Sequence, residues 1–206
     1  MAGAQRIYRS QNRILLSRIF AVLLLLVFLF TKSPELLRFP TIIVLGLLGL
    51  LLATLGAFGR VWSSVYIAGR KTNELVDQGP YSITRNPLYV FSLLGAVGLG
   101  LASCNPVVLI LLLALFILYY PGVISKEEAK LRRKHGDSFE EYMATVPRIL
   151  PHFSLFRQPE QITVNPKPIT RAFTDAIWFI VGYVALRALV WLHAFSFLPA
   201  LELPLF

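Results

Sequence analysis

Two short polar clusters interrupt an otherwise apolar sequence and contain the residue types best suited to chemistry. The first, Gly79–Tyr89, reads GPYSITRNPLY and combines two tyrosines, Arg85 and an Asn-Pro pair. The second is Lys126-Glu127-Glu128, placed where an apolar run ends. An arginine guanidinium can hold a carboxylate or phosphate through two parallel hydrogen bonds, tyrosine rings can face a cation, and glutamates accept hydrogen bonds from hydroxyl or ammonium groups. Such a set suits a charged, amphipathic ligand.

Each of these residues also has a purely structural interpretation. Arg85 could be one of many basic residues at a membrane surface, and Asn86-Pro87 could only begin a helix. The tyrosines could belong to an aromatic belt, and the glutamate pair could favour a helix start through the helix dipole. Adjacent residues on a helix point about 100° apart, so we expect only one of the two glutamates to face a pocket. The shared position of both clusters at one membrane edge favours a single site.

The composition places the chain among membrane proteins. Its 206 residues are 56% hydrophobic and 15% charged, which is more apolar than soluble domains of this size. A helix that spans a bilayer needs about 20 apolar residues, and five runs approach this length. We therefore predict an all-α, polytopic membrane fold with about five spans, at residues 19–31, 41–59, 87–102, 106–125 and 176–197.

The charge pattern predicts the orientation of these spans. All of the 20 lysines and arginines except Lys32, Arg38 and Arg187 fall on one side of the predicted membrane. By the positive-inside rule, the N-terminus and the polar clusters are expected to be cytoplasmic, and the C-terminus outside. The basic surface is expected to face anionic lipids, which argues against nucleic acid as a partner. Arg187 lies inside the last span, where a charge is costly unless it snorkels or finds a partner.

Turn residues predict that the third and fourth spans form a helical hairpin. Asn86 and Pro87 are typical of a helix start, and Asn105 and Pro106 repeat this pattern after a short turn. The open end of the hairpin would bring Arg85–Tyr89 and Lys126–Glu128 to the same membrane edge. This geometry depends only on turn rules and span lengths.

The remaining segments are assigned from local composition. Thr41 is expected to cap the second span, and four glycines in that span are expected to allow close helix packing. Residues 125–144 predict an interfacial helix with a break near Gly136. Residues 146–151 are expected to be extended, and residues 152–171 to form a linker. We divide the chain into residues 1–54, with the first helices, residues 55–151, with the polar clusters, and residues 152–206, with the linker and last helix.

Both clusters belong to longer motifs that resemble a known family. Residues 73–76 (NELV), 79–81 (GPY) and 85–89 (RNPLY) resemble the signature (H)xLVxxGxYxxxRHPxY of integral-membrane methyltransferases, the isoprenylcysteine carboxyl methyltransferase and phospholipid N-methyltransferase group. Residues 127–131 (EEAKL), with Gly136, Phe139, Tyr142 and 146–148 (VPR), are similar to the second block of that family. The turn at residues 104–106 (CNP) is also similar. The resemblance covers residues 55–151.

The resemblance implies an enzyme that uses S-adenosylmethionine, with S-adenosylhomocysteine as product, bound between the two blocks at the cytoplasmic edge. It implies that Arg85 and Glu128 lie near the reacting centre, with Glu128 as general base if the nucleophile is protonated. The acceptor is expected to be a lipidic or small hydrophobic molecule. The residues that would line the cofactor site are Asn73, Glu74, Leu75, Val76, Tyr81, Asn86, Pro87, Leu88, Tyr89 and Glu127.

Departures from the family pattern leave the acceptor open. Asn73 and Asn86 stand where the family often has histidines, and Val123 stands where the isoprenylcysteine enzymes have an arginine. We therefore rank an unspecified lipid-like acceptor first, an amine headgroup second and a prenylcysteine carboxylate third. A non-catalytic membrane module or a membrane reductase with a nicotinamide cofactor are the alternatives, although the sequence has no GxGxxG fingerprint. Expected partners are membrane lipids and the acceptor, and no feature indicates an oligomeric state.

Overall fold

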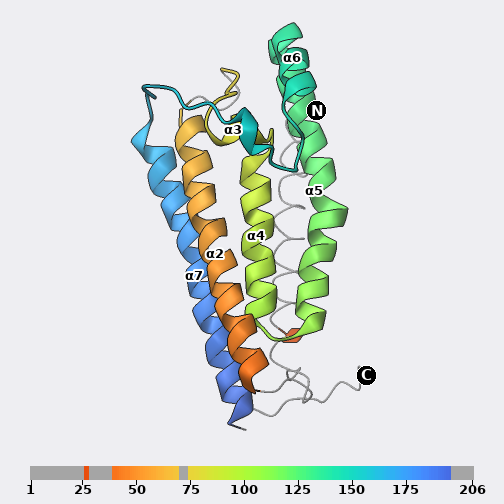
Figure 1. The fold of residues 1–206 in the computed structure, drawn as a ribbon, viewed down its shortest axis with the longest axis vertical. Helices are drawn as coiled ribbons and strands as arrows, with labels where there is room; N and C mark the ends of the chain where they lie inside the picture. The colour runs from red at the N-terminus through yellow and green to blue at the C-terminus, as the bar shows by residue number, and fades with distance from the viewer. Residues whose placement is uncertain (1–25, 28–38, 70–73, 196–206) are drawn as a thin grey trace, which may run out of the picture.

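The computed structural model describes residues 26–27, 39–69 and 74–195, and all regular secondary structure within these ranges is helical (Figure 1). The predicted all-α, polytopic membrane fold is confirmed. The elements are α2 (Phe39–Ile67), α3 (Pro80–Ile83), α4 (Pro87–Ala102), α5 (Pro106–His135), α6 (Asp137–Thr145), the 3-10 helix η1 (Phe153–Leu155) and α7 (Pro166–Ala194).

The long helices run side by side along the longest axis of the molecule. Among the described residues, α2, α5 and α7 are each long and apolar enough to cross a membrane. Helix α4 has 16 residues, about 24 Å at 1.5 Å per residue, and is therefore shorter than the hydrocarbon core. The first predicted span, residues 19–31, lies outside the described residues apart from 26–27. In Figure 1, α2 lies between α7 and α4, and α5 flanks α4 on the other side.

Small residues allow α2 and α4 to approach closely, as the glycine pattern of the second span predicts. A Cβ atom built at Gly56 would lie 2.6 Å from the Cα atom of Gly95, and one built at Gly49 would lie 2.7 Å from the carbonyl oxygen of Gly98. These neighbours are backbone atoms, which cannot move aside as a flexible side chain can. The contact between α2 and α4 therefore depends on the absence of side chains at these positions.

The predicted hairpin of α4 and α5 is present, and its tip is buried within the bundle. The Asn105 side chain caps α5 by accepting hydrogen bonds from the backbone N–H groups of Val107 and Val108, at 2.9 and 3.4 Å. Ser103, Cys104 and Asn105 are all buried. Irregular backbone at membrane depth needs protein partners for its polar groups, and the hairpin tip is placed where α7 can supply one.

Arg187 of α7 reaches this hairpin tip from inside the bundle. Its Nη1 atom lies 3.4 Å from the carbonyl oxygen of Ala102, at the end of α4, and 3.5 Å from Cys104 Sγ. Gly46 of α2 leaves room for the guanidinium, because a Cβ there would lie 2.9 Å from its central carbon. A cation at the C-terminus of a helix interacts favourably with the helix dipole. Arg187 therefore has a partner inside the membrane span, which is the C-terminal end of α4.

Helix α5 continues further than the sequence predicts. Helix α5 runs without a break from Pro106 to His135. The prediction of a separate interfacial helix over residues 125–144 was therefore wrong for its first half, which belongs to α5. Pro121 does not end the helix, and the strong helix formers after it extend the helix beyond the apolar run. The expected break at Gly136 is confirmed, with φ 52°, and α6 then forms the second half of the predicted segment.

The boundaries of the other long helices also differ. The expected linker over residues 152–171 is shorter, because α7 begins at Pro166 after Asn165, whose side chain accepts a hydrogen bond from the Lys167 backbone N–H. Proline is tolerated in the first turn, which the prediction underestimated. Helix α2 begins at Phe39, so Thr41 lies within its first turn and is not the cap. The division of the chain at residues 54 and 151 stays a prediction.

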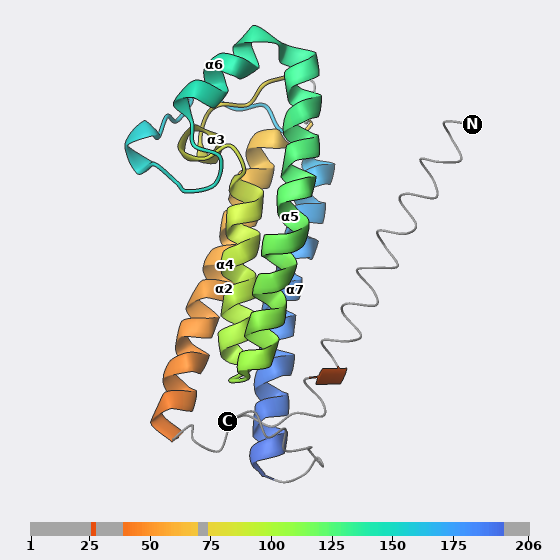
Figure 2. The ribbon, with the colours of Figure 1, turned by 90° about the vertical axis from the view of Figure 1, so that its right-hand side faces the viewer.

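Helix α6 and the segment after it fold back over one end of the bundle (Figure 2). Phe139, Tyr142 and Val146 form a buried cluster with Leu75 and Leu131, which attaches α6 to α5 and to the loop before α3. The segment 146–157, which includes η1, then follows residues 79–86 through backbone hydrogen bonds, including Arg85 N to Pro147 O at 2.9 Å, His152 N to Ile83 O at 2.8 Å and Gly79 N to Arg157 O at 2.7 Å.

The α2–α4 contact predicts a clear difference between two glycine-to-alanine substitutions. Gly56→Ala should destabilise the protein by about 1–3 kcal/mol, the usual cost of overpacking, because its new methyl group meets the α4 backbone. Gly122→Ala in α5, where a Cβ would meet nothing within 4 Å, should leave stability unchanged or raise it. Thermal unfolding of both variants in detergent measures the difference. Equal melting temperatures for the two variants would contradict the proposed packing.

Candidate functional site

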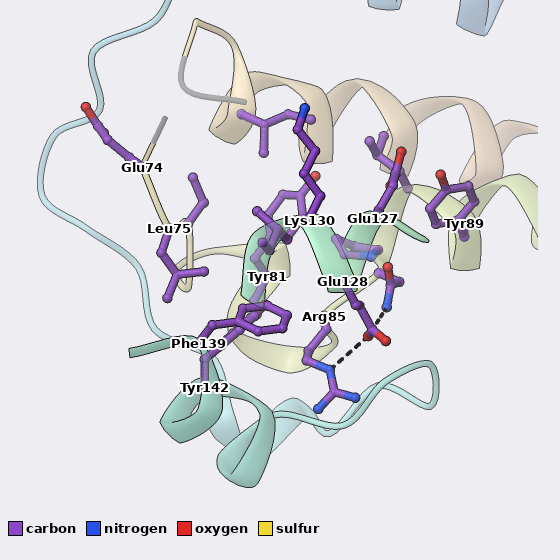
Figure 3. Close-up of a pocket in the computed structure, with 16 residues that line it drawn as sticks. Glu74, Leu75, Tyr81, Arg85, Tyr89, Glu127, Glu128, Lys130, Phe139 and Tyr142 are labelled. Carbon is purple, nitrogen blue, oxygen red and sulfur yellow. Dashed lines mark hydrogen bonds and ion pairs between the residues drawn. The ribbon is translucent and has the colours of Figure 1, made fainter. Parts of the chain in front are cut away.

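A pocket opens at the end of the bundle where α6 folds over (Figure 3). It lies among the end of α2, the loop before α3, the first turn of α4, the last third of α5, and α6. These elements are distant in sequence and meet because the α4–α5 hairpin returns the chain to the same end. The lining residues are Ile67, Glu74, Leu75, Val76, Tyr81, Arg85, Asn86, Pro87, Leu88, Tyr89, Glu127, Glu128, Lys130, Leu131, Phe139 and Tyr142.

Glu128 connects three segments of the chain at the base of this pocket. Its Oε1 atom accepts hydrogen bonds from Arg85 Nε at 3.2 Å and from Asn86 Nδ2 at 3.1 Å. Its Oε2 atom lies 3.0 Å from Arg148 Nε, an ion pair whose angle is not that of a hydrogen bond. The Arg85 and Glu128 side chains are only 13% and 15% exposed. The carboxylate is therefore largely shielded from solvent and fully engaged by cationic and amide groups.

Arg85 is held by further contacts that only an arginine can make together. Its Nη1 atom donates hydrogen bonds to the backbone carbonyl oxygens of Met143 at 2.8 Å and Val146 at 3.2 Å, while its Nε atom contacts Glu128. A lysine ammonium is a point charge on a flexible stem and cannot reproduce this planar arrangement. Arg85 therefore fixes the end of α6 against α5.

Asn86 is placed where a helix cap is expected but does not act as one. It is the residue before α4, yet its side chain makes no capping hydrogen bond. The amide instead donates to Glu128 and, at 3.0 Å, to the backbone carbonyl of Arg148. The prediction that the Asn86 side chain caps α4 was wrong, because the two bonds that its amide nitrogen donates orient the side chain toward other segments and leave its oxygen without a capping bond.

The adjacent glutamates face different directions, as their spacing on a helix predicts. Figure 3 shows Glu128 directed to Arg85, whereas Glu127 points away from this network, beside Tyr89. Within the described part of the chain, Glu127 makes no hydrogen bond or ion pair with another side chain, and it borders the pocket. Its carboxylate is the acidic group of this pair that a bound molecule can engage.

Two buried tyrosines, Tyr81 of α3 and Tyr142 of α6, line the pocket. The Tyr142 hydroxyl donates a 2.7 Å hydrogen bond to the Tyr81 carbonyl oxygen. Burial raises the pKa of Tyr81 well above its ordinary value, and Tyr142, Glu127 and Tyr89 nearby raise it further, while the positive charge of Arg60 opposes the shift. Burial also raises the pKa of Tyr142. Both phenols therefore stay neutral at physiological pH.

Every site residue expected from sequence borders this pocket except Asn73, which lies outside the described residues. The roles of these residues in cofactor binding and catalysis stay predictions. Sequence reasoning treated Leu131, Phe139 and Tyr142 only as parts of the second block, and did not expect Ile67 to line the pocket. It also missed Arg148 as a partner of Glu128, since no local pattern connects an extended segment with a helix.

The fold and the pocket define a polytopic helical membrane protein with a polar site at one end of its bundle. The sequence model of the phospholipid methyltransferase family matches residues 41–138. This region contains most of α2, all of α4 and α5, and the three pocket glutamates, Glu74, Glu127 and Glu128.

Three curated proteins resemble the chain. The cobalt-zinc-cadmium resistance protein CzcN of Cupriavidus metallidurans is 41% identical over 68% of this chain and 63% of its own length. The nickel-cobalt-cadmium resistance protein NccN of Alcaligenes xylosoxydans xylosoxydans is 38% identical over 77% of this chain and 75% of its own length. Protein-S-isoprenylcysteine O-methyltransferase B of Arabidopsis thaliana is 30% identical over 42% of this chain and 44% of its own length. No solved structure matches the chain.

The chain therefore belongs to the phospholipid methyltransferase family of membrane proteins, which confirms the resemblance found in its motifs. The alignment with CzcN spans less than two thirds of that relative.

The buried network around Glu128 predicts a large effect on stability. Glu128→Ala should cost about 3 kcal/mol, because it leaves Arg85 buried without its counter-charge. Glu140→Ala is the matched control: Glu140 pairs with Arg132 in α5, and both side chains are more than half exposed, so this change should cost less than about 1 kcal/mol. Chemical or thermal unfolding followed by circular dichroism measures both values. Similar losses in the two variants would show that Glu128 does not support the pocket.

Proposed function

We propose that this protein transfers a methyl group from S-adenosylmethionine to a lipidic or small hydrophobic acceptor at the cytoplasmic face of the membrane, in the manner of the isoprenylcysteine carboxyl methyltransferases. One observation carries the proposal: residues of both sequence blocks line a single pocket at the end of an apolar hairpin. Membership in the phospholipid methyltransferase family supports the reaction class.

The chemical character of the pocket fits this cofactor. Leu75, Val76, Leu88 and Leu131 give apolar surface for a purine base. Glu127 can accept hydrogen bonds from ribose hydroxyls or from the cofactor ammonium group. Tyrosine rings at residues 81 and 89 suit a sulfonium, because the negative face of an aromatic ring attracts a cation.

The chain contributes binding and orientation to such a transfer. When bound, the cofactor supplies an electrophilic methyl group, and the broken S–C bond leaves its electron pair on sulfur as the acceptor's nucleophile bonds to the carbon. Positioning accounts for much of the rate gain in reactions of this kind. The Arg85–Glu128 pair fixes α5 against α4 and α6. It thereby fixes the part of α5 that carries Glu127 into the pocket lining. We assign both residues of the pair to the vicinity of the reacting centre.

The acceptor and the orientation follow from the membrane setting. The apolar surfaces of α2, α4 and α5 begin directly beside the pocket, so an apolar acceptor can approach within the bilayer. The bias of lysine and arginine toward the pocket end supports a cytoplasmic site and a cytoplasmic N-terminus. An amine headgroup, as in the phospholipid N-methyltransferases, is the second candidate acceptor, and a proton lost from it would need a base such as Glu128.

Cofactor affinity provides the first test. Purified protein should bind S-adenosylhomocysteine saturably in calorimetry, and Glu127→Gln should weaken this binding by about tenfold or more, since charge-assisted hydrogen bonds contribute roughly 1.5–3 kcal/mol. Glu141→Gln on the exposed side of α6 removes the same charge and should leave the affinity unchanged. Both variants should unfold at the wild-type temperature.

Two outcomes would count against this assignment. Wild-type protein that binds NADPH but not S-adenosylhomocysteine would favour the reductase alternative, and protein that binds neither would favour a non-catalytic membrane module. Unchanged affinity in Glu127→Gln would reject Glu127 as a cofactor contact.

The acceptor can be identified by comparing lipid extracts from cells with and without the protein. Mass spectrometry should reveal a species heavier than its precursor by one added CH₂ unit in cells that produce the wild-type chain. Cells that produce Glu127→Gln should lack it, and cells with Glu141→Gln should retain it. Identical lipid profiles in all four cultures would contradict a lipid acceptor.

A further inference from the structure

Arg60 is a charged residue near the pocket that belongs to neither sequence block. It lies in α2, seven residues before Ile67, which lines the pocket. This separation is two helical turns, or about 10 Å along the axis toward the middle of the bundle. The apolar run of α2 ends at this position, so the guanidinium lies on the membrane side of the pocket.

The Arg60 side chain turns into the bundle. Its Nη1 atom donates a hydrogen bond to the hydroxyl of Ser92 in α4, which is buried. Its guanidinium carbon lies 5.9 Å from the centre of the Phe179 ring in α7. A basic residue that only marks the cytoplasmic border would extend to water or to lipid phosphates. Arg60 instead contacts two neighbouring helices.

This inward charge lies close to the membrane end of the pocket. Ser92 follows Tyr89, which lines the pocket, by about one helical turn. The charge of Arg60 also acts on the buried Tyr81 phenol, where it opposes the rise in pKa. On the other side, the Tyr89 ring meets the Tyr120 ring of α5 at 5.3 Å between centroids. The polar contact between Arg60 and Ser92 therefore lies near an aromatic wall, formed by Tyr89, Tyr120 and Phe116, at the membrane end of the pocket.

Within the described residues, Arg60 has no carboxylate partner. The ion pairs there join Glu128, Glu140 and Asp77 to other arginines. The Ser92 hydroxyl engages one of the five N–H donors of the guanidinium and itself donates to the Leu88 carbonyl. An inward-facing cation in a membrane helix is costly without an anion, and such residues mark binding sites for charged groups.

We propose that Arg60, held in place by Ser92, forms an anion-binding subsite for the methyl acceptor, which is therefore an amphipathic molecule with a carboxylate or phosphate in its head. This rests on the proposed function, because it places the acceptor on the membrane side of the cofactor pocket. The N–H groups of the guanidinium that Ser92 leaves open match the oxygens of either group. The adjacent aromatic wall, in which Tyr120 stacks on Phe116 at 4.1 Å, contacts the beginning of the apolar chain.

The position of Arg60 favours the acceptor over the cofactor as the source of this anion. A carboxylate of a cofactor in the pocket has Lys130 beside it, whereas Arg60 lies about two turns further toward the membrane. A molecule dissolved in the bilayer would meet Arg60 before it reaches the pocket. The subsite thus selects the head of a membrane-borne molecule.

Fluorescence quenching can test the subsite without any methyl transfer. Trp62 contacts the Phe91 ring of α4 close to Arg60, and replacing Trp178 and Trp191, both exposed, with Phe makes its emission unique. Brominated stearate, stearyl phosphate, stearyl alcohol and stearylamine are then titrated into this protein in a non-ionic detergent. The stearate and stearyl phosphate arms distinguish a carboxylate from a phosphate.

The anionic probes should quench Trp62 at concentrations about tenfold lower than the neutral and cationic ones, the effect of one charge-assisted contact. Arg60→Gln should abolish this preference and leave S-adenosylhomocysteine affinity unchanged. Arg60→Lys should retain part of the preference as a point charge. Arg171→Gln, which removes an exposed charge at the start of α7, should retain all of it.

Several results would overturn the subsite. Equal quenching by anionic and neutral probes in the wild-type background would do so whether or not any variant folds. A preference for anionic probes that persists in Arg60→Gln would also reject the subsite, whether or not that variant still binds S-adenosylhomocysteine. An Arg60-dependent preference in a protein that binds no S-adenosylhomocysteine would instead reject the proposed methyl transfer and leave the anion site standing.

Discussion

The carboxylate of Glu128 is the interaction on which the arrangement of the pocket depends. It joins Arg85 and Asn86, at the start of α4, to Arg148 in the extended segment after α6. The start of α4, the end of α5 and the segment after α6 are far apart in the sequence, and this network holds them together at one end of the bundle. Because Glu128 is committed to this network, its neighbour Glu127 is left to face the pocket from the same helix. Glu128 stabilises the arrangement of the site, and the adjacent Glu127 contributes a carboxylate to the pocket.

Much of the fold can be predicted because strong local signals determine it. Asn105 with Pro106 specifies a helix start that needs no tertiary information, and the hairpin follows from it. Glycines in α2 indicate close packing because only they permit backbone contact, as at Gly56. The extent of α5 and α7 could not be predicted in the same way. An apolar run shows which residues lie in the membrane, but it does not show where the helix begins or ends. Helix α5 continues past the membrane because good helix formers follow the apolar run, and α7 begins before it because proline is tolerated in the first turn.

The candidate site is predictable where it follows motifs and not where it depends on tertiary contacts. The hairpin and two motif blocks lead directly to most of the pocket lining. The Asn86 amide nitrogen donates to Glu128 and to the Arg148 carbonyl, and this orientation leaves the amide oxygen without a capping bond to the first backbone N–H groups of α4. Arg60 looks in sequence like one of many basic residues at a membrane border. Only the packing of α2 on α4 turns it inward, toward Ser92.

The central claim is that the two sequence blocks form one binding site for S-adenosylmethionine. Ultraviolet cross-linking of methyl-labelled S-adenosylmethionine to the purified protein, followed by peptide mapping, tests this claim most directly. The account predicts label in peptides that contain residues 74–89 and 127–142, and excess S-adenosylhomocysteine should displace this label. Label that is not displaced, or that occurs only in peptides outside both blocks, would contradict it.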